Sequence, residues 1–448
     1  MTPISSKIQN LLYLLIIVLA TFGCNNDSEN NVDTTSPIKM LISTDIATGL
    51  TDTHGGQGSV PVTFNSSGKD ADFTPQDLDD GLTVAMALNL HSQNLIEVDA
   101  IIPIFGNATL PAEMLTANQI VRNLKGFHDL PMAPGANAQV SQTLQPTPEY
   151  YTGETVPIAG TDGSFCAACL NSGVELMYNR LLASSIPMTI LAIGPLTDVA
   201  CLLTKFPQIK PKISEIIVLA SQVKGKGLFI NGKTVNDFNF RMDPVGGALF
   251  LYAADEVPVK LMSFALSGQT SQSGDRYMHF DNTTLKGPNP PTAASQKSLN
   301  WIIEASKPRN EFWKSIFGAA EGPFDQYTLV AAIKPELFDC QEGLAYVQMC
   351  PYPAWSPDFE NPGGTPYNTA NNPCIDHAPG TGSLSQVPAQ LVVSLDLSDT
   401  GPLVRGTTGI DGNIPQFNSS ARKVTVCTNF VDERAFEIFK QFIYEQTW

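Results

Sequence analysis

Basic residues are scarce in this chain of 448 residues. It has 26 Lys and Arg against 43 Asp and Glu, and a formal net charge of −17 at pH 7. Contacts to a nucleic-acid backbone need clustered Lys and Arg, so nucleic acid is excluded as the expected partner. Histidine is rarer still, with 5 scattered residues, and the spacing of a zinc site does not occur.

Long hydrophobic runs are also lacking. The run at 11–22 is shorter than the roughly 20 residues that span a bilayer, and Lys7 precedes it. A basic residue followed by a short apolar run is typical of a signal peptide. The run leads into Thr21-Phe22-Gly23-Cys24, which resembles a degenerate bacterial lipobox. We therefore expect residues 1–23 to be a signal peptide and Cys24 to be acylated.

These features predict an exported bacterial protein that a lipid anchor holds to a membrane, in the periplasm or at the cell surface. Residues 24–36 are polar and would form a tether. The alternative is a plain secretory signal in which Cys24 is incidental.

Eight cysteines in an exported chain suggest disulfides. Cys166 and Cys169 could form a local disulfide or a redox pair, and we favour a structural role because no thioredoxin-like strand precedes them. Four later cysteines surround a Pro- and Gly-rich insertion and are expected to staple it: Cys340, Cys350, Cys374 and Cys427.

Apolar strands alternate with helices along the rest of the chain. Segments such as 96–105 and 213–220 are apolar along most of their length, which is typical of parallel strands covered on both faces. The alternation predicts an α/β fold with one doubly wound, mostly parallel sheet and helices on both faces. We expect a single large domain at 37–448, with insertions at about 46–78 and 350–388.

Three carboxylates lie where the first predicted strand ends and the next helix begins. Asp45 follows the strand at 38–44, and Asp79 and Asp80 open an apolar helix. Open α/β sheets bind ligands at the carboxyl ends of their strands, and carboxylate oxygens suit Ca²⁺ or Mg²⁺. The sequence therefore predicts a divalent-cation site, although an Asp at a helix start is often only a cap.

This interrupted stretch resembles the Asp-x-Asp-x-Gly-x-Asp-Asp motif of the inosine–uridine-preferring nucleoside hydrolases. Ser43 stands in place of the first Asp, and 33 residues lie between Asp45 and Asp79 where the family has three. Further segments resemble the family in the same order: Gly194-Pro195-Leu196-Thr197-Asp198, Asp237-Phe238-Asn239 and Phe324-Asp325-Gln326-Tyr327-Thr328. In the family, the last two read Glu-Phe-Asn and His-Asp-Pro-Leu-Ala.

The resemblance implies hydrolysis of the N-glycosidic bond of a ribonucleoside to ribose and free base, with Ca²⁺ as cofactor. It implies that Asp45 is a calcium ligand and the general base that activates a metal-bound water. The further implied ligands are the Asp80 and Asp325 carboxylates and the backbone carbonyl of Ile193. The implied ribose contacts are Asp79, Asn107, Asn231, Asp237 and Asn239.

Phe324 departs from the family pattern, because many members have a His there that helps the nucleobase leave. Phe cannot donate a proton, although it could stack on a base and so contact substrate. Leaving-group activation could come from His54 in the insertion. Alternatively, the enzyme acts on ribosides with good leaving groups or is catalytically weak.

Two other functions stay open. The first is a ribose- or nucleoside-binding lipoprotein without turnover, which Phe324 favours, whereas the retained Asp45 favours an enzyme. The second is hydrolysis of another N-riboside, such as a nicotinamide compound. The expected partners are a small nucleoside or ribose and the membrane, and a homo-oligomer is compatible with the sequence.

Overall fold

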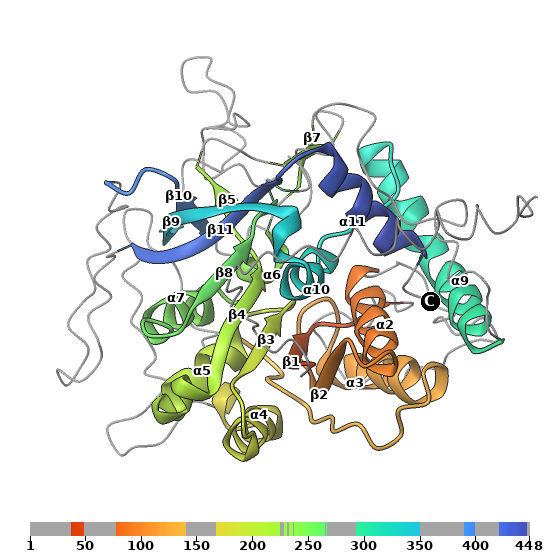
Figure 1. Cartoon of the computed structure of the whole chain (residues 1–448), viewed down its shortest axis with the longest axis horizontal. Helices are drawn as coiled ribbons and strands as arrows, with labels where there is room; N and C mark the ends of the chain where they lie inside the picture. The colour runs from red at the N-terminus through yellow and green to blue at the C-terminus, as the bar shows by residue number, and fades with distance from the viewer. Residues whose placement is uncertain are drawn as a thin grey trace, which may run out of the picture. The chain divides into compact units, whose positions relative to one another are not determined.

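A nine-stranded sheet runs through the computed structural model of the chain (Figure 1). Every strand of the sheet belongs to one compact unit, Ile38–Trp448. The structure describes residues 37–48, 78–139, 167–224, 228–230, 233–235, 237–264, 266, 293–349, 389–398 and 421–445.

The sheet is parallel over most of its width. Its strands, in spatial order, are β2 (Ile96–Pro103), β1 (Ile38–Thr44), β3 (Met188–Ala192), β4 (Ile213–Leu219), β8 (Val259–Met262), β11 (Arg422–Phe430), β9 (Phe338–Met349), β10 (Ala389–Ser394) and β5 (Gln222–Val223). Pairing is parallel from β2 to β11, antiparallel through β9 to β10, and parallel again at β5. A separate two-stranded sheet joins β6 (Leu228–Ile230) to β7 (Lys233–Val235).

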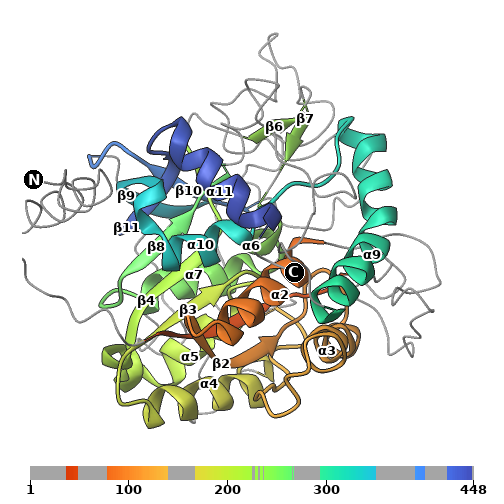
Figure 2. The same cartoon turned by 45° about the vertical axis from the view of Figure 1, so that its right-hand side comes forward.

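Helices cover both faces of this sheet, which confirms the predicted doubly wound α/β fold (Figures 1 and 2). One hydrophobic core contains residues of α2 (Asp79–Ser92), η2 (Gln119–Leu124), α9 (Ala293–Phe317), α10 (Gln326–Ile333) and α11 (Glu433–Glu445). The other core contains residues of α4 (Ser172–Ala183), α5 (Thr197–Lys205) and α7 (Pro244–Ala253). Because apolar side chains alternate between the two cores, the parallel strands are buried on both faces.

Two features of the fold differ from what the sequence pattern predicts. The helix expected at 112–124 is divided into α3 (Leu110–Asn118) and the π-helix η2. Strand β9 was not expected at all, because its sequence mixes polar residues with Gly343 and lacks a continuous apolar run. It forms a strand because it pairs with β10 on one side and β11 on the other. Glycine is needed at position 343 because a Cβ there would lie 2.6 Å from Cγ1 of Val393 on β10.

Two disulfides are present among the described residues. Cys340 pairs with Cys427 directly across β9 and β11, as expected for cysteines beside the insertion. The prediction of a local pair for Cys169 is wrong, because its partner is Cys201 on α5, at a Cα–Cα distance of 5.2 Å. The two cysteines pair because their segments are neighbours in space, although they are 32 residues apart in the sequence.

Several expectations lie outside the described residues. These are the signal peptide at 1–23, the tether at 24–36 with Cys24, most of the insertion at 46–78, the whole of the insertion at 350–388, and the cysteines at 166, 350 and 374. Within the part of the chain that the structure describes, no helix combines the length and the apolar character that crossing a membrane requires.

Candidate active site

The carboxyl end of β1 meets the first turn of α2. Thr44 ends the strand and Asp45 follows it, and both are fully buried. The Thr44 hydroxyl donates a hydrogen bond to Oδ1 of Asp80 in the first turn of α2. This hydrogen bond joins the two halves of the interrupted acidic stretch in space.

Three carboxylates come together beside this junction. Asp79, Asp80 and Asp325 each offer an oxygen, and these oxygens lie within 4.8 Å of one another. The three side chains are at most 3% exposed. Buried like charges at this spacing repel unless a cation shares them, and an all-oxygen donor set suits Ca²⁺ or Mg²⁺. The residues present therefore fit a divalent cation.

These carboxylates lie at the starts of two helices, α2 and α10. The backbone N–H of Asp325, just before α10, donates to Oδ2 of Asp79 at 3.2 Å, and the Gln326 side chain donates from Nε2 to the Asp79 carbonyl at 2.8 Å. Because helix N-termini favour negative charge, the two helix starts together make the carboxylates easier to bury. Asp325 is the N-cap of α10 by position, yet its side chain makes no capping hydrogen bond in the described helix. Helix capping therefore does not explain why a carboxylate is buried at position 325.

Asp45 lies at the ends of the neighbouring strands and is not a member of the group of three among the described residues. Its Oδ2 accepts from the Asn107 backbone N–H at 3.1 Å, and the Asn107 side chain donates to the Asp45 carbonyl at 3.3 Å. A Cβ on Gly106 would lie 2.1 Å from Oδ2 of Asp45, and one on Gly194 would lie 2.9 Å from its Oδ1. Glycine at both positions lets the segments that follow β2 and β3 approach this carboxylate.

The chain after β4 places Asp237 and Asn239 on the short helix α6 (Phe238–Met242). Asp237 caps α6, since its carboxylate accepts from the backbone N–H groups of Phe240 at 3.0 Å and Ser221 at 2.7 Å. Asn239 Nδ2 donates to the Ile193 carbonyl at 2.9 Å. The structure therefore brings Asn239 to the carbonyl expected to bind metal, and gives Asp237 the task of orienting α6.

Phe324 lies in the protein core beside Asp325. Its ring is 5% exposed and packs against Phe264 and Trp313, with centroids 5.5 and 5.9 Å away. These contacts explain how an aromatic residue is accommodated at this position. Two other candidates, His54 and Asn231, lie outside the described residues.

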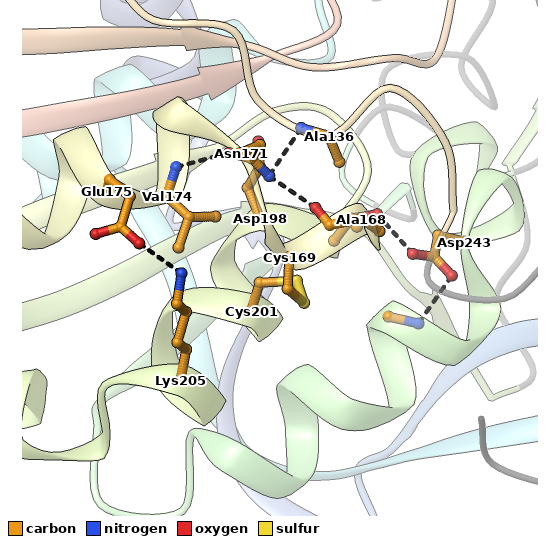
Figure 3. Close-up of a disulfide and its surroundings, with 12 residues drawn as sticks. Ala136, Ala168, Cys169, Asn171, Val174, Glu175, Asp198, Cys201, Lys205 and Asp243 are labelled. Carbon is orange, nitrogen blue, oxygen red and sulfur yellow. Dashed lines mark hydrogen bonds and ion pairs between the residues drawn. A yellow bond between two sulfur atoms is a disulfide. The ribbon is translucent and has the colours of Figure 1, made fainter. Parts of the chain in front are cut away.

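Asp198 is a buried titratable residue whose role sequence reasoning missed. Burial raises the pKa of its carboxyl from 3.8 to about 7, against the lowering effect of hydrogen bonds from Asn171 and Ala136. Both donors reach Oδ1 at 3.0 Å, beside the Cys169–Cys201 disulfide (Figure 3). The sequence marks Asp198 only as an early residue of a helix, because its partners lie 27 and 62 positions away.

Comparison with known proteins identifies the family of the chain. The family described as inosine-uridine preferring nucleoside hydrolase matches residues 70–437, well over half of the chain. The chain belongs to this family. As a nucleoside hydrolase it is an N-glycosyl hydrolase of ribonucleosides.

Individual relatives agree with that assignment. The pyrimidine-specific ribonucleoside hydrolase RihA of Citrobacter koseri is 27% identical over 270 residues, covering 59% of this chain and 78% of its own. RihA of Shewanella baltica is 27% identical over 266 residues, covering 58% and 76%. The solved plant nucleoside hydrolase PpNRh1 has the same fold, with a TM-score of 0.54 and 15% identity, over 91% of this nucleoside hydrolase and 99% of the plant chain.

Proposed function

We propose that this nucleoside hydrolase is calcium-dependent and that Asp45 is its general base. The observation that supports a metal is the group of three buried carboxylates at the carboxyl end of β1. The proposed ligands are Asp80, Asp325, Asp45 and the Ile193 carbonyl. A divalent cation, when bound there, supplies positive charge that acidifies water and orients vicinal hydroxyls.

The protein's own groups have separate tasks in this proposal. The Asp45 carboxylate takes a proton from the attacking water as the N-glycosidic bond breaks. The Asn107 backbone N–H keeps that carboxylate in place. Asp79 accepts hydrogen bonds from the ribose hydroxyls, and the amides of Asn107 and Asn239 complete the sugar contacts. Burial of this site excludes bulk water, which strengthens each of these polar contacts.

Release of ribose tests the enzyme proposal. Purified protein is assayed with uridine, cytidine and inosine in Ca²⁺ and in a chelator, and reducing sugar is measured. Pyrimidine nucleosides come first because the RihA relatives are named pyrimidine-specific. We expect Ca²⁺-dependent ribose release that Asp45→Asn lowers by about 10²- to 10⁴-fold, the usual contribution of a general base. The surface variant Asp255→Asn is the control and should keep full activity.

A second candidate is a binding protein that has lost turnover. The observation that favours it is the core packing of Phe324 where many family members use a His. Calcium-dependent binding of nucleoside or ribose, measured by calorimetry without ribose release from any nucleoside, would establish this candidate and reject the enzyme. Ribose release from uridine would do the reverse.

The N-terminal segment completes the proposal. A membrane-anchored hydrolase outside the cytoplasm would scavenge nucleosides, and Cys24 is the proposed site of the lipid anchor. Expression of the full chain with Cys24→Ala should move the protein from the membrane fraction to the soluble fraction. Unchanged membrane association of Cys24→Ala would reject the anchor.

A further inference from the structure

The first turn of α2 and the end of β1 are far apart in the sequence. Asp79 and Asp80 belong to this turn, whereas Asp45 directly follows β1, and 33 residues lie between Asp45 and Asp79. Described side chains join the two segments in space, since Thr44 at the end of β1 donates to Oδ1 of Asp80 and Thr48 contacts the same turn.

The first turn of α2 also lacks a local cap. Its N-cap residue is Leu78, and no side-chain capping hydrogen bond is made there in the described structure. Ser, Thr, Asp or Asn usually occupies this position and accepts a hydrogen bond from one of the first backbone N–H groups of the helix. Leu has no atom that can do so.

Thr48 supplies the missing cap from the other side of the insertion. Its hydroxyl accepts from the backbone N–H of Gly81 at 3.1 Å and donates to the carbonyl of Leu78 at 3.1 Å. Gly81 is the third helical residue, whose N–H a local cap would bind. Thr48 is fully buried, three residues after Asp45. One hydroxyl thus ties the segment that carries Asp45 to the turn that carries Asp79 and Asp80.

Gly81 has the shape that this contact requires. A Cβ at Gly81 would lie 2.1 Å from Oγ1 of Thr48, 2.7 Å from its Cβ and 2.9 Å from Cδ1 of Ile120. Any side chain at position 81 would therefore push Thr48 away from the turn. The Gly81 backbone is not in a left-handed conformation, so close approach is the reason for glycine here.

We propose that Thr48 is a positioning residue that caps α2 across the insertion and holds Asp79 and Asp80 in register with Asp45 for binding of the divalent cation. This role rests on the proposed calcium-dependent function. The α10 side of the turn is held separately by Gln326, whose Nε2 donates to the Asp79 carbonyl. The Thr44–Asp80 hydrogen bond still joins the turn to the end of β1. Loss of the Thr48 hydroxyl therefore removes the anchor between this turn and the segment that follows Asp45, while the contacts to α10 and to Thr44 remain.

The variant Thr48→Val tests this role, because it keeps the shape of the side chain and removes the hydroxyl. Loss of its two hydrogen bonds should weaken Ca²⁺ binding, measured by calorimetry, by about tenfold. Hydrogen exchange of the peptide that contains Gly81 should become faster. At saturating Ca²⁺, the kcat of Thr48→Val should be closer to the wild-type value than its Ca²⁺ affinity is. The variant Thr48→Ser keeps the hydroxyl, so it should restore both the Ca²⁺ affinity and the slow hydrogen exchange near Gly81.

Thr83→Val is the matched control. Thr83 is a fully buried threonine on the same helix, and its hydroxyl has no hydrogen-bond partner among the described residues. The same chemical change there should leave Ca²⁺ affinity and exchange near Gly81 as in the wild type. Thr48→Ala serves as a second variant, and it should show the same loss if Thr48→Val does not fold.

The outcomes separate this role from the function on which it rests. Wild-type protein that releases ribose with Ca²⁺, together with Thr48 variants that match Thr83→Val in affinity and exchange, would overturn the positioning role alone. A wild type that binds no Ca²⁺ would overturn both proposals. Weaker Ca²⁺ binding by Thr48→Val and Thr48→Ala, with rescue by Thr48→Ser, would support the role.

Discussion

Asp198 should make the stability of this nucleoside hydrolase depend on pH in an unusual direction. Most native carboxylates have a lowered pKa and lose stabilisation as pH falls, whereas burial raises the pKa of Asp198 to about 7. Below pH 3.8, Asp198 is protonated in both the folded and the unfolded chain. As pH rises toward 7, the unfolded chain releases the proton first, and the folded state becomes progressively less stable.

The size of this effect follows from the two pKa values. A shift from 3.8 to about 7 spans about three pH units, and each unit corresponds to about 1.4 kcal/mol. Asp198 therefore costs about 4 kcal/mol of unfolding free energy above pH 7 relative to pH 4. Asp198→Asn removes the ionisation while its amide oxygen can still accept from Ala136 and Asn171.

Denaturant unfolding of wild type and Asp198→Asn from pH 4 to pH 8 measures this cost. The unfolding free energy of the variant minus that of the wild type should rise by about 4 kcal/mol from pH 4 to pH 8. Fitting an amide beside Gly135 has a cost that does not depend on pH, so it does not change this rise. Asp255→Asn is the control, since the hydrogen bond from Lys210 lowers the pKa of Asp255 and its effect should have the opposite sign and be small. A difference for Asp198→Asn that stays constant with pH would refute the reasoning.

Three further changes test the site and the fold. Asp325→Asn should abolish Ca²⁺ binding in calorimetry with folding retained; binding at wild-type affinity would remove Asp325 from the ligands. Gly106→Ala should lower kcat about 10²-fold, because its Cβ would displace the Asp45 carboxylate, and an unchanged kcat would speak against the role of Asp45. The double variant Cys340→Ala, Cys427→Ala opens a crosslink with a sequence separation of 87, so denaturant unfolding should show a loss of about 4 kcal/mol, and a loss below about 1 kcal/mol would contradict this.

Local pattern was sufficient to predict much of the architecture. Strand β1 was predicted with its observed bounds, and α2 begins at Asp79 and Asp80, the two carboxylates that the sequence placed at a helix start. These features depend on residues that are neighbours in the chain. A buried apolar run or a capping residue has the same physical meaning wherever the chain folds.

Other features could not be predicted because their causes are distant in sequence. Strand β9 exists because β10 and β11 flank it, and Cys169 finds Cys201 because η3 (Ala167–Cys169) packs against α5. The raised pKa of Asp198 comes from the bulk of the protein around it.

The sequence by itself determined the fold class, the family and the candidate carboxylates for a divalent-cation site. Motif order and hydrophobic periodicity are properties of the chain alone, so they can be found without the structure. Only the tertiary structure decided that Asp79, Asp80 and Asp325 share one site, that Phe324 packs in the core, and that Thr48 caps a distant helix. The physical reason is the separation in sequence between the interacting groups. Periodicity and local capping act between residues a few positions apart. The grouping of carboxylates, the desolvation of Asp198 and the capping of α2 by Thr48 depend on distances in space that only folding sets.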